Sequence, residues 1–148
     1  MSLSFCDRAS RSSGKGSAPD PASAASMADE TAMAAASVEA ACNAFLSATA
    51  QADRAAAEKM LLDFRSWSSP LATCRHLLLH SSVAYAKLQA LFTVRECLGT
   101  QWTSLSAADR TELQRLLLQQ QTQPDAEHFV KEAAAQVLAV HAKQDLLD

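Results

Sequence analysis

The sequence contains few of the residues that interrupt or bend helices. Only three glycines, four prolines and one tyrosine occur among its 148 residues, whereas 49% of the residues are hydrophobic, and many of these are alanine. Alanine, leucine, glutamine and glutamate lose little conformational freedom in a helix, and the β-branched residues that favour strands are sparse. The composition therefore predicts an all-α protein.

The same composition argues against two classes of partner. The formal net charge is −3, so the chain lacks the basic surface that nucleic-acid binding requires. No apolar run approaches the roughly 18 residues that are needed to cross a bilayer, so we expect no membrane insertion. The four cysteines are widely spaced and form no C-x-x-C pair. We therefore expect reduced thiols rather than a disulfide framework.

Two regions differ in composition. Residues 1–28 are rich in Ser, Ala, Gly and Pro and cannot bury enough apolar surface to offset the entropy of ordering, so we expect disorder there. Residues 29–148 contain apolar residues at helical spacing. We predict six helices in this region, at about residues 30–48, 52–66, 70–80, 83–101, 106–121 and 125–143.

The predicted helices form pairs that begin near residues 30, 70 and 106. The resulting period of about 36–40 residues is close to that of the helical hairpins in HEAT-type repeats, which stack on their neighbours. The last helix keeps an apolar face up to the final "KQDLLD". We therefore expect an α-solenoid of about three HEAT-type hairpins, representing the first part of a longer array.

One short stretch, "ATCRHLLLHSS" at residues 72–82, has the spacing of three zinc ligands: Cys74, His76 and His80. A helix turns by about 100° per residue, which places Cys74 on the apolar stripe with Leu77 and Leu78. The two histidines then lie at about 200° and 240° from Cys74, too far round the helix to share one tetrahedral ion with it. They could hold a metal as a pair, or lie on a solvated helix surface, which is the interpretation that we prefer.

The remaining candidates for chemistry do not form a catalytic set. His128 is predicted at a helix surface, and His141 falls on the apolar stripe of the last helix, where a packed imidazole is expected. The sequence has no G-x-S-x-G elbow, no glycine-rich phosphate loop and no cluster of carboxylates. We therefore predict neither an enzyme nor a cofactor or metal.

Several motifs in residues 57–102 resemble the amino-terminal repeats of nuclear exportins in the importin-β superfamily. They are "AEKMLLDFR", "SPLATCRHLL", "SSVAYAKLQA" and the "QW" that closes the fourth helix, and "VLAVHAKQDLLD" at the end of the chain matches as well. The resemblance covers about residues 40–148 and lies in the order and spacing of these motifs. Arg95 is a departure, because it occupies a position on the predicted buried stripe where the family is apolar.

The resemblance implies an α-solenoid whose second helices line a concave surface. Exportins bind the GTP form of the Ran GTPase through their amino-terminal repeats, together with protein cargo, and they contact nuclear pore proteins. They shuttle between nucleus and cytoplasm, where GTP hydrolysis releases the cargo. The resemblance therefore predicts a nuclear export receptor. The alternative is a HEAT-repeat scaffold or adaptor that does not depend on Ran.

Helical angles suggest which polar residues on the second, fourth and sixth helices point outward. These candidates for contact with Ran-GTP are Lys59, Asp63, Gln89, Thr93, Glu96, Glu132 and Gln136. Each of them is equally compatible with a solvated surface position that has no partner.

Overall fold

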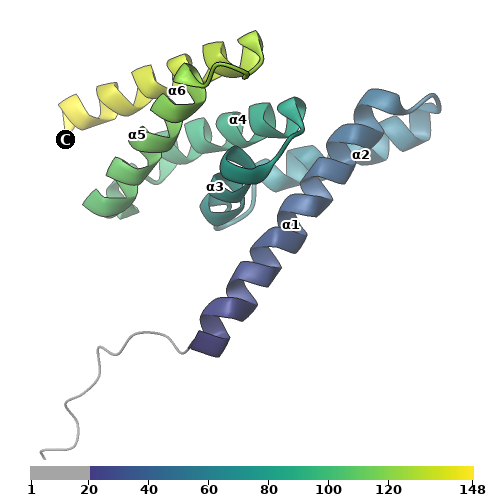
Figure 1. Cartoon of the computed structure of the whole chain (residues 1–148), viewed down its shortest axis with the longest axis horizontal. Helices are drawn as coiled ribbons and strands as arrows, with labels where there is room; N and C mark the ends of the chain where they lie inside the picture. Colours follow the sequence, from purple (N-terminus) through teal and green to yellow (C-terminus); the bar gives the residue numbers. More distant parts are fainter. Residues whose placement is uncertain (1–20) are drawn as a thin grey trace, which may run out of the picture.

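The computed structural model describes residues 21–148, in which all regular structure is helical (Figure 1). The elements are α1 (Pro21–Ser47), α2 (Gln51–Arg65), α3 (Leu71–His80), α4 (Ala84–Thr100), the 3-10 helix η2 (Trp102–Ser104), α5 (Ala107–Thr122) and α6 (His128–Leu147). The prediction of an all-α protein with six α-helices is confirmed for this part of the chain.

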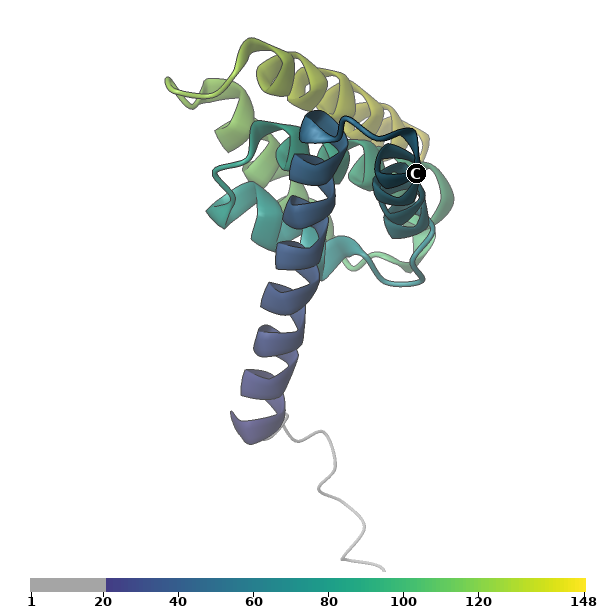
Figure 2. The same cartoon turned by 90° about the vertical axis from the view of Figure 1, so that its right-hand side faces the viewer.

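Helix α1 begins well before the predicted position. Residues 1–20 lie outside the described residues, but residues 21–28, which were predicted to be disordered, form the first two turns of α1. Alanine is the strongest helix former, and Pro21 occupies the first helical position, where its missing N–H costs no hydrogen bond. The first turns of α1 project beyond the rest of the molecule (Figures 1 and 2).

The other helices agree more closely with the predicted boundaries. Helices α2 to α5 begin and end within one residue of them, whereas α6 begins at His128 rather than near residue 125. A turn delays this start, because the Ala126 N–H donates to the Gln123 carbonyl at 3.3 Å and Glu127 is extended. At the start of α5, the predicted cap is present: the Ser106 hydroxyl accepts from the Asp109 N–H at 3.1 Å.

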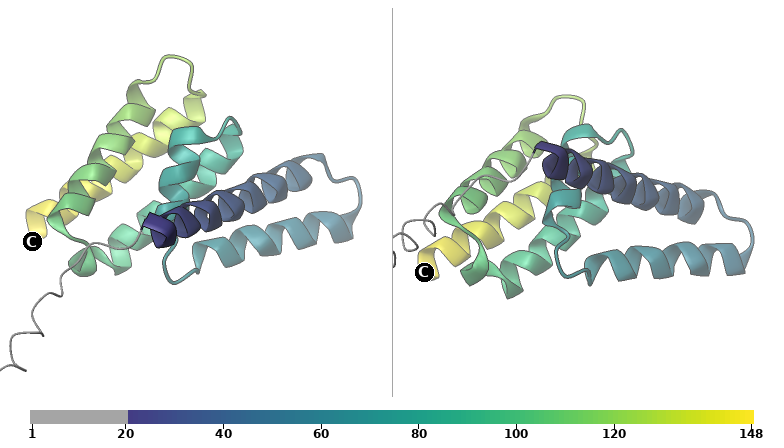
Figure 3. Two further views of the ribbon diagram at one scale, coloured as in Figure 1. Left: turned by 60° about the horizontal axis from the view of Figure 1, so that its bottom comes forward. Right: turned by 90° about the horizontal axis from the view of Figure 1, so that it is seen from below.

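The helices pair into three hairpins, α1–α2, α3–α4 and α5–α6, which lie side by side in chain order (Figure 3). Most contacts between neighbouring hairpins join first helices with first helices and second helices with second helices. Helix α1 packs on α3 and α3 on α5, while α2 packs on α4 and α4 on α6, and α1 also touches α4. The α1–α2 turn and the carboxyl end of α6 lie at opposite ends of the molecule (Figure 1). The hairpins therefore form two rows of helices.

The core runs through all three hairpins. Apart from Val38 of α1, its largest completely or almost completely buried apolar side chains come from α2 to α6: Phe64, Leu77, Leu78, Leu91, Leu98, Leu113, Leu116, Leu117, Val94 and Val130. Besides Val38, helix α1 contributes the smaller residues Ala35 and Cys42. Helix α1 thus contributes no buried leucine or phenylalanine to the core.

An ion pair links the second and third hairpins on the outside of this core. The Arg75 guanidinium of α3 donates to Asp109 of α5 at 2.9 Å, and both side chains are partly exposed. Asp109 Oδ2 also accepts a hydrogen bond from the Ser106 hydroxyl at 2.7 Å. These two bonds lower the pKa of Asp109 below its ordinary value of 3.8, and the bond from Arg75 has the larger effect.

Two adjacent leucines of α5 test the position of the core. Leu117 is completely buried, whereas the Leu118 side chain is 47% exposed. Leu117→Ala should lower the free energy of unfolding by about 2–5 kcal/mol, since it removes buried methyl groups and leaves a cavity. Leu118→Ala, the matched control, should cost less than about 1 kcal/mol. Urea denaturation measures both, and similar losses would contradict this packing.

The ion pair predicts a pH dependence. Because the pKa of Asp109 is lower in the folded chain than in the unfolded chain, the pair stabilises the fold above the ordinary pKa. This contribution is lost as the pH falls through the lowered value. An NMR titration of the Asp109 carboxyl carbon should give a midpoint below 3.8 that Arg75→Gln raises and Lys59→Gln leaves unchanged. A midpoint unaffected by Arg75→Gln would show that this contact does not form in solution.

Candidate partner-binding face

The second helices of the three hairpins offer a row of surface that crosses the whole molecule. We call the exposed side chains of α2, α4 and α6 the even-helix face. Helix α4 lies between the other two and contacts both, so the side chains of α2 and those of α6 each border those of α4. All seven residues that helical angles selected belong to these helices.

The structure divides those seven residues into two groups. Lys59, Asp63, Glu96, Glu132 and Gln136 are exposed and can reach a partner. Gln89 and Thr93 are buried, with 3% and 0% of their surface exposed, so the prediction that they face outward is wrong. The Arg65 guanidinium donates to Gln89 Oε1 at 2.8 Å, and the Thr93 hydroxyl donates to the Gln89 carbonyl at 2.9 Å.

The charged residues among the exposed candidates form only weak contacts with the rest of the fold. Lys59 pairs with Asp63 one turn later at 3.1 Å, with side chains that are 79% and 59% exposed. Such a pair contributes less than about 1 kcal/mol and gives way easily to another partner. On α6, Glu132 Oε2 lies 3.9 Å from His128 Nδ1, and both side chains are largely exposed. These charges are therefore free to contact another molecule.

A hollow of about 400 Å³ lies between α2 and α4 on this face. It is lined by Arg65 from α2 and by Phe92, Arg95 and Glu96 from α4. The Arg65 guanidinium covers the Phe92 ring, 5.2 Å from its centroid, which is within the range of an attractive cation–π contact. Arg95 is exposed at the rim, so the prediction that it lies on the buried stripe is wrong. Helical angle alone did not reveal this hollow, because Arg65 and Phe92 meet only through packing of α2 on α4.

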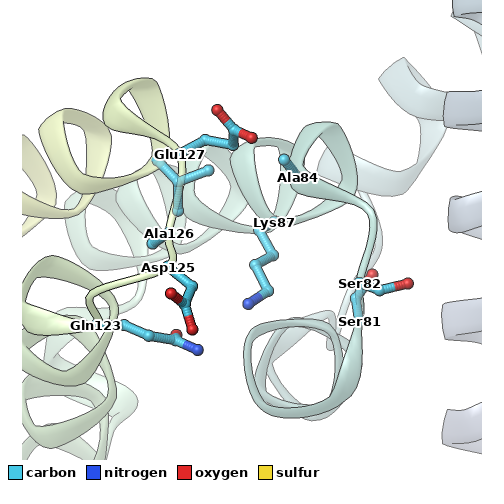
Figure 4. Close-up of a pocket in the computed structure, with 9 residues that line it drawn as sticks. Ser81, Ser82, Ala84, Lys87, Gln123, Asp125, Ala126 and Glu127 are labelled. Carbon is cyan, nitrogen blue, oxygen red and sulfur yellow. The ribbon is translucent and has the colours of Figure 1, made fainter.

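A second hollow lies where the α3–α4 and α5–α6 connections meet. Lys87 of α4 extends its ammonium group toward the side on which Asp125 and Gln123 lie, while the Glu127 carboxylate points away (Figure 4). Ser81 and other residues of the α3–α4 connection complete the wall. Sequence reasoning missed this cluster, because the two connections are about 40 residues apart in the chain.

The zinc hypothesis fails on geometry. Cys74 is completely buried, whereas His80 is exposed and His76 is half-buried on another side of α3. The two imidazoles are neighbours, with ring centroids 4.8 Å apart. They border a hollow shared with Met27 of α1, a contact that exists because α1 begins earlier than predicted. Within the described part of the chain, no group of three or more His, Cys, Asp or Glu could hold a metal ion.

The other predicted core positions agree with the structure. His141 is 3% exposed, its ring meets Trp102 edge to face with centroids 5.1 Å apart, and its Nε2 lies 2.9 Å from the Arg110 carbonyl oxygen. Burial raises the pKa of the Cys42 thiol to about 11 and also raises the pKa values of Cys74 and Cys97. These thiols stay protonated at neutral pH and are poor nucleophiles.

Comparisons with known proteins leave the chain without a family assignment. No family model matches the sequence, and no solved structure matches the chain. Among the described helices, none is both long enough and apolar enough to span a membrane.

Gln89 and Lys59 provide a direct test of this division into buried and exposed candidates. Gln89→Ala should lower the free energy of unfolding by about 1–3 kcal/mol, because it removes the hydrogen-bond partner of the Arg65 guanidinium. Lys59→Ala, which alters an exposed pair, should change it by less than about 0.5 kcal/mol. Thermal unfolding followed by circular dichroism measures both variants. A larger loss for Lys59→Ala would contradict the assignment.

Proposed function

We propose that the three hairpins are HEAT-type repeats of an α-solenoid, and that the chain is the amino-terminal part of an exportin-4-like nuclear export receptor of the importin-β superfamily. Two features support the proposal. The motifs of residues 57–102 have the order and spacing of those repeats. Helices α3 and α5 also begin 36 residues apart, at Leu71 and Ala107, which is close to one HEAT-type repeat.

The even-helix face is the observation that carries the functional proposal. It extends over three hairpins, and its exposed candidates are charged or polar: Lys59, Asp63, Glu96, Glu132 and Gln136. Neighbouring second helices in repeat arrays form extended surfaces, which suit a folded protein partner better than a small molecule. In the exportins that the sequence resembles, this row of helices contacts Ran.

The proposed cycle follows from this partner. The chain binds Ran in its GTP form together with protein cargo, passes nuclear pore proteins, and releases cargo in the cytoplasm after GTP hydrolysis. It then shuttles between nucleus and cytoplasm. No catalytic group of the chain takes part, because Ran itself hydrolyses the nucleotide.

A Ran-independent scaffold is the second candidate. It is favoured by two adjacent exposed apolar side chains at the carboxyl end of α6: Leu146 is 87% exposed and Leu147 73%. Apolar side chains that gather on a surface often mark contacts with other proteins. A scaffold would use that end of the array for assembly, without regard to the nucleotide state of any partner.

Nucleotide-dependent capture separates the two candidates. The immobilised chain should retain Ran locked with a GTP analogue and should not retain Ran-GDP. Glu132→Lys on the even-helix face should weaken capture roughly fivefold, since reversing a charge at an interface costs about 1 kcal/mol or more. Glu112→Lys on α5, the matched control, should have no effect. Equal capture of both nucleotide forms, or capture of neither, would contradict the proposal and favour the scaffold.

A further inference from the structure

The hollow between α2 and α4 has an unbalanced charge. Its walls carry two guanidinium groups, from Arg65 and Arg95, and one carboxylate, from Glu96, which leaves one net positive charge. Elsewhere, Arg75 pairs with Asp109 and Arg115 with Glu112. Arg95 forms no ion pair within the described part of the chain. Arg54 also forms no ion pair within the described part of the chain and lies over the Phe45 ring, but the hollow between α2 and α4 is lined by two guanidinium groups.

The hydrogen-bond donors of Arg65 are also incompletely used. A guanidinium has five N–H donors, and the Arg65 group makes one side-chain hydrogen bond, to Gln89. Its Nε is buried without a partner, as are the Nε atoms of Arg75 and Arg110. The contact with Gln89 and the stacking on Phe92 hold the guanidinium plane in place, so little entropy is lost when a further acceptor binds.

We propose that this hollow binds a carboxylate side chain, aspartate or glutamate, in an acidic and apolar segment of a protein partner. One carboxylate matches the single net positive charge, and its planar group suits a guanidinium. The methylene groups of such a side chain can pack at the edge of Phe92. A doubly charged phosphate would exceed the single net positive charge and leave one negative charge uncompensated beside Glu96. The inference rests on the proposed function only in placing a protein partner against the even-helix face.

The test uses the full chain and a fluorescent Gly-Ser peptide that contains one glutamate between two leucines. Binding is measured by fluorescence anisotropy and by the Nε–Hε NMR signals of Arg65 and Arg95. We expect a dissociation constant on the order of a millimolar or below, since only one charged contact and a small apolar contact are made. Matched peptides with glutamine or phosphoserine in place of glutamate should bind several-fold more weakly.

Variants at the rim of the hollow avoid the packed Arg65 and should fold normally. Arg95→Gln should weaken binding of the glutamate peptide about fivefold, and Glu96→Gln should tighten it about twofold, because it removes a repulsive charge. Lys143→Gln, an exposed position on α6, removes the same charge as Arg95→Gln and should change affinity less than twofold. Circular dichroism confirms that the variants fold.

Several outcomes would overturn the inference: no binding of the glutamate peptide, equal losses in Arg95→Gln and Lys143→Gln, or a preference for phosphoserine. The Ran experiment is separate. If the peptide results hold and Ran-GTP is not captured, the carboxylate site stands and the exportin proposal fails. If Ran-GTP is captured but the peptide does not bind, the exportin proposal stands and the carboxylate site fails.

Discussion

The rest of the structure depends on the burial of α4 between neighbours on several sides. This helix packs against its own partner α3 and also against α2 and α6. Its Leu91, Val94 and Leu98 are completely buried, and burial of each such side chain is worth about 1.5–3 kcal/mol. Helix α3 also contacts all three hairpins, through α1 and α5, whereas α4 contacts both helices of the first hairpin as well as α3 and α6. The apolar contacts of α4 therefore turn three hairpins, none of which could bury its own apolar face, into one folded unit.

The same constraint determines which surface remains available for binding. Helix α2 packs on one side of α4, where Gln89 and Thr93 are buried. The residues of α4 that stay accessible on this side include Phe92, Arg95 and Glu96. Arg65 then closes over Phe92 from the side of α2. The hollow on the even-helix face is thus a direct result of how closely the first two hairpins pack. A change in that packing would alter the binding surface as well as the stability.

The two rows of helices differ in how their charges are used. On α3 and α5, Arg75 pairs with Asp109 across the hairpins, and Arg115 pairs with Glu112 within α5. The Arg115–Glu112 pair is exposed, like the pairs of the even-helix face, so the difference lies in Arg95, which forms no ion pair within the described part of the chain. A charge that is already paired within the same chain attracts a partner only weakly. An unpaired surface charge influences the orientation and the rate of association. This difference supports the proposal that a partner binds the even-helix face.

The sequence by itself determined the helical class, five helix starts to within about three residues, and the burial of Cys74 and His141. Each of these follows from local propensity or from the period of one amphipathic helix. The early start of α1 was missed because an alanine-rich segment has no apolar stripe to mark it. Only the tertiary structure decided that Gln89 is buried, that Arg95 is exposed and that Arg65 meets Phe92. Those outcomes depend on how many neighbours surround α4, and the angle of a residue around its own helix does not contain that information.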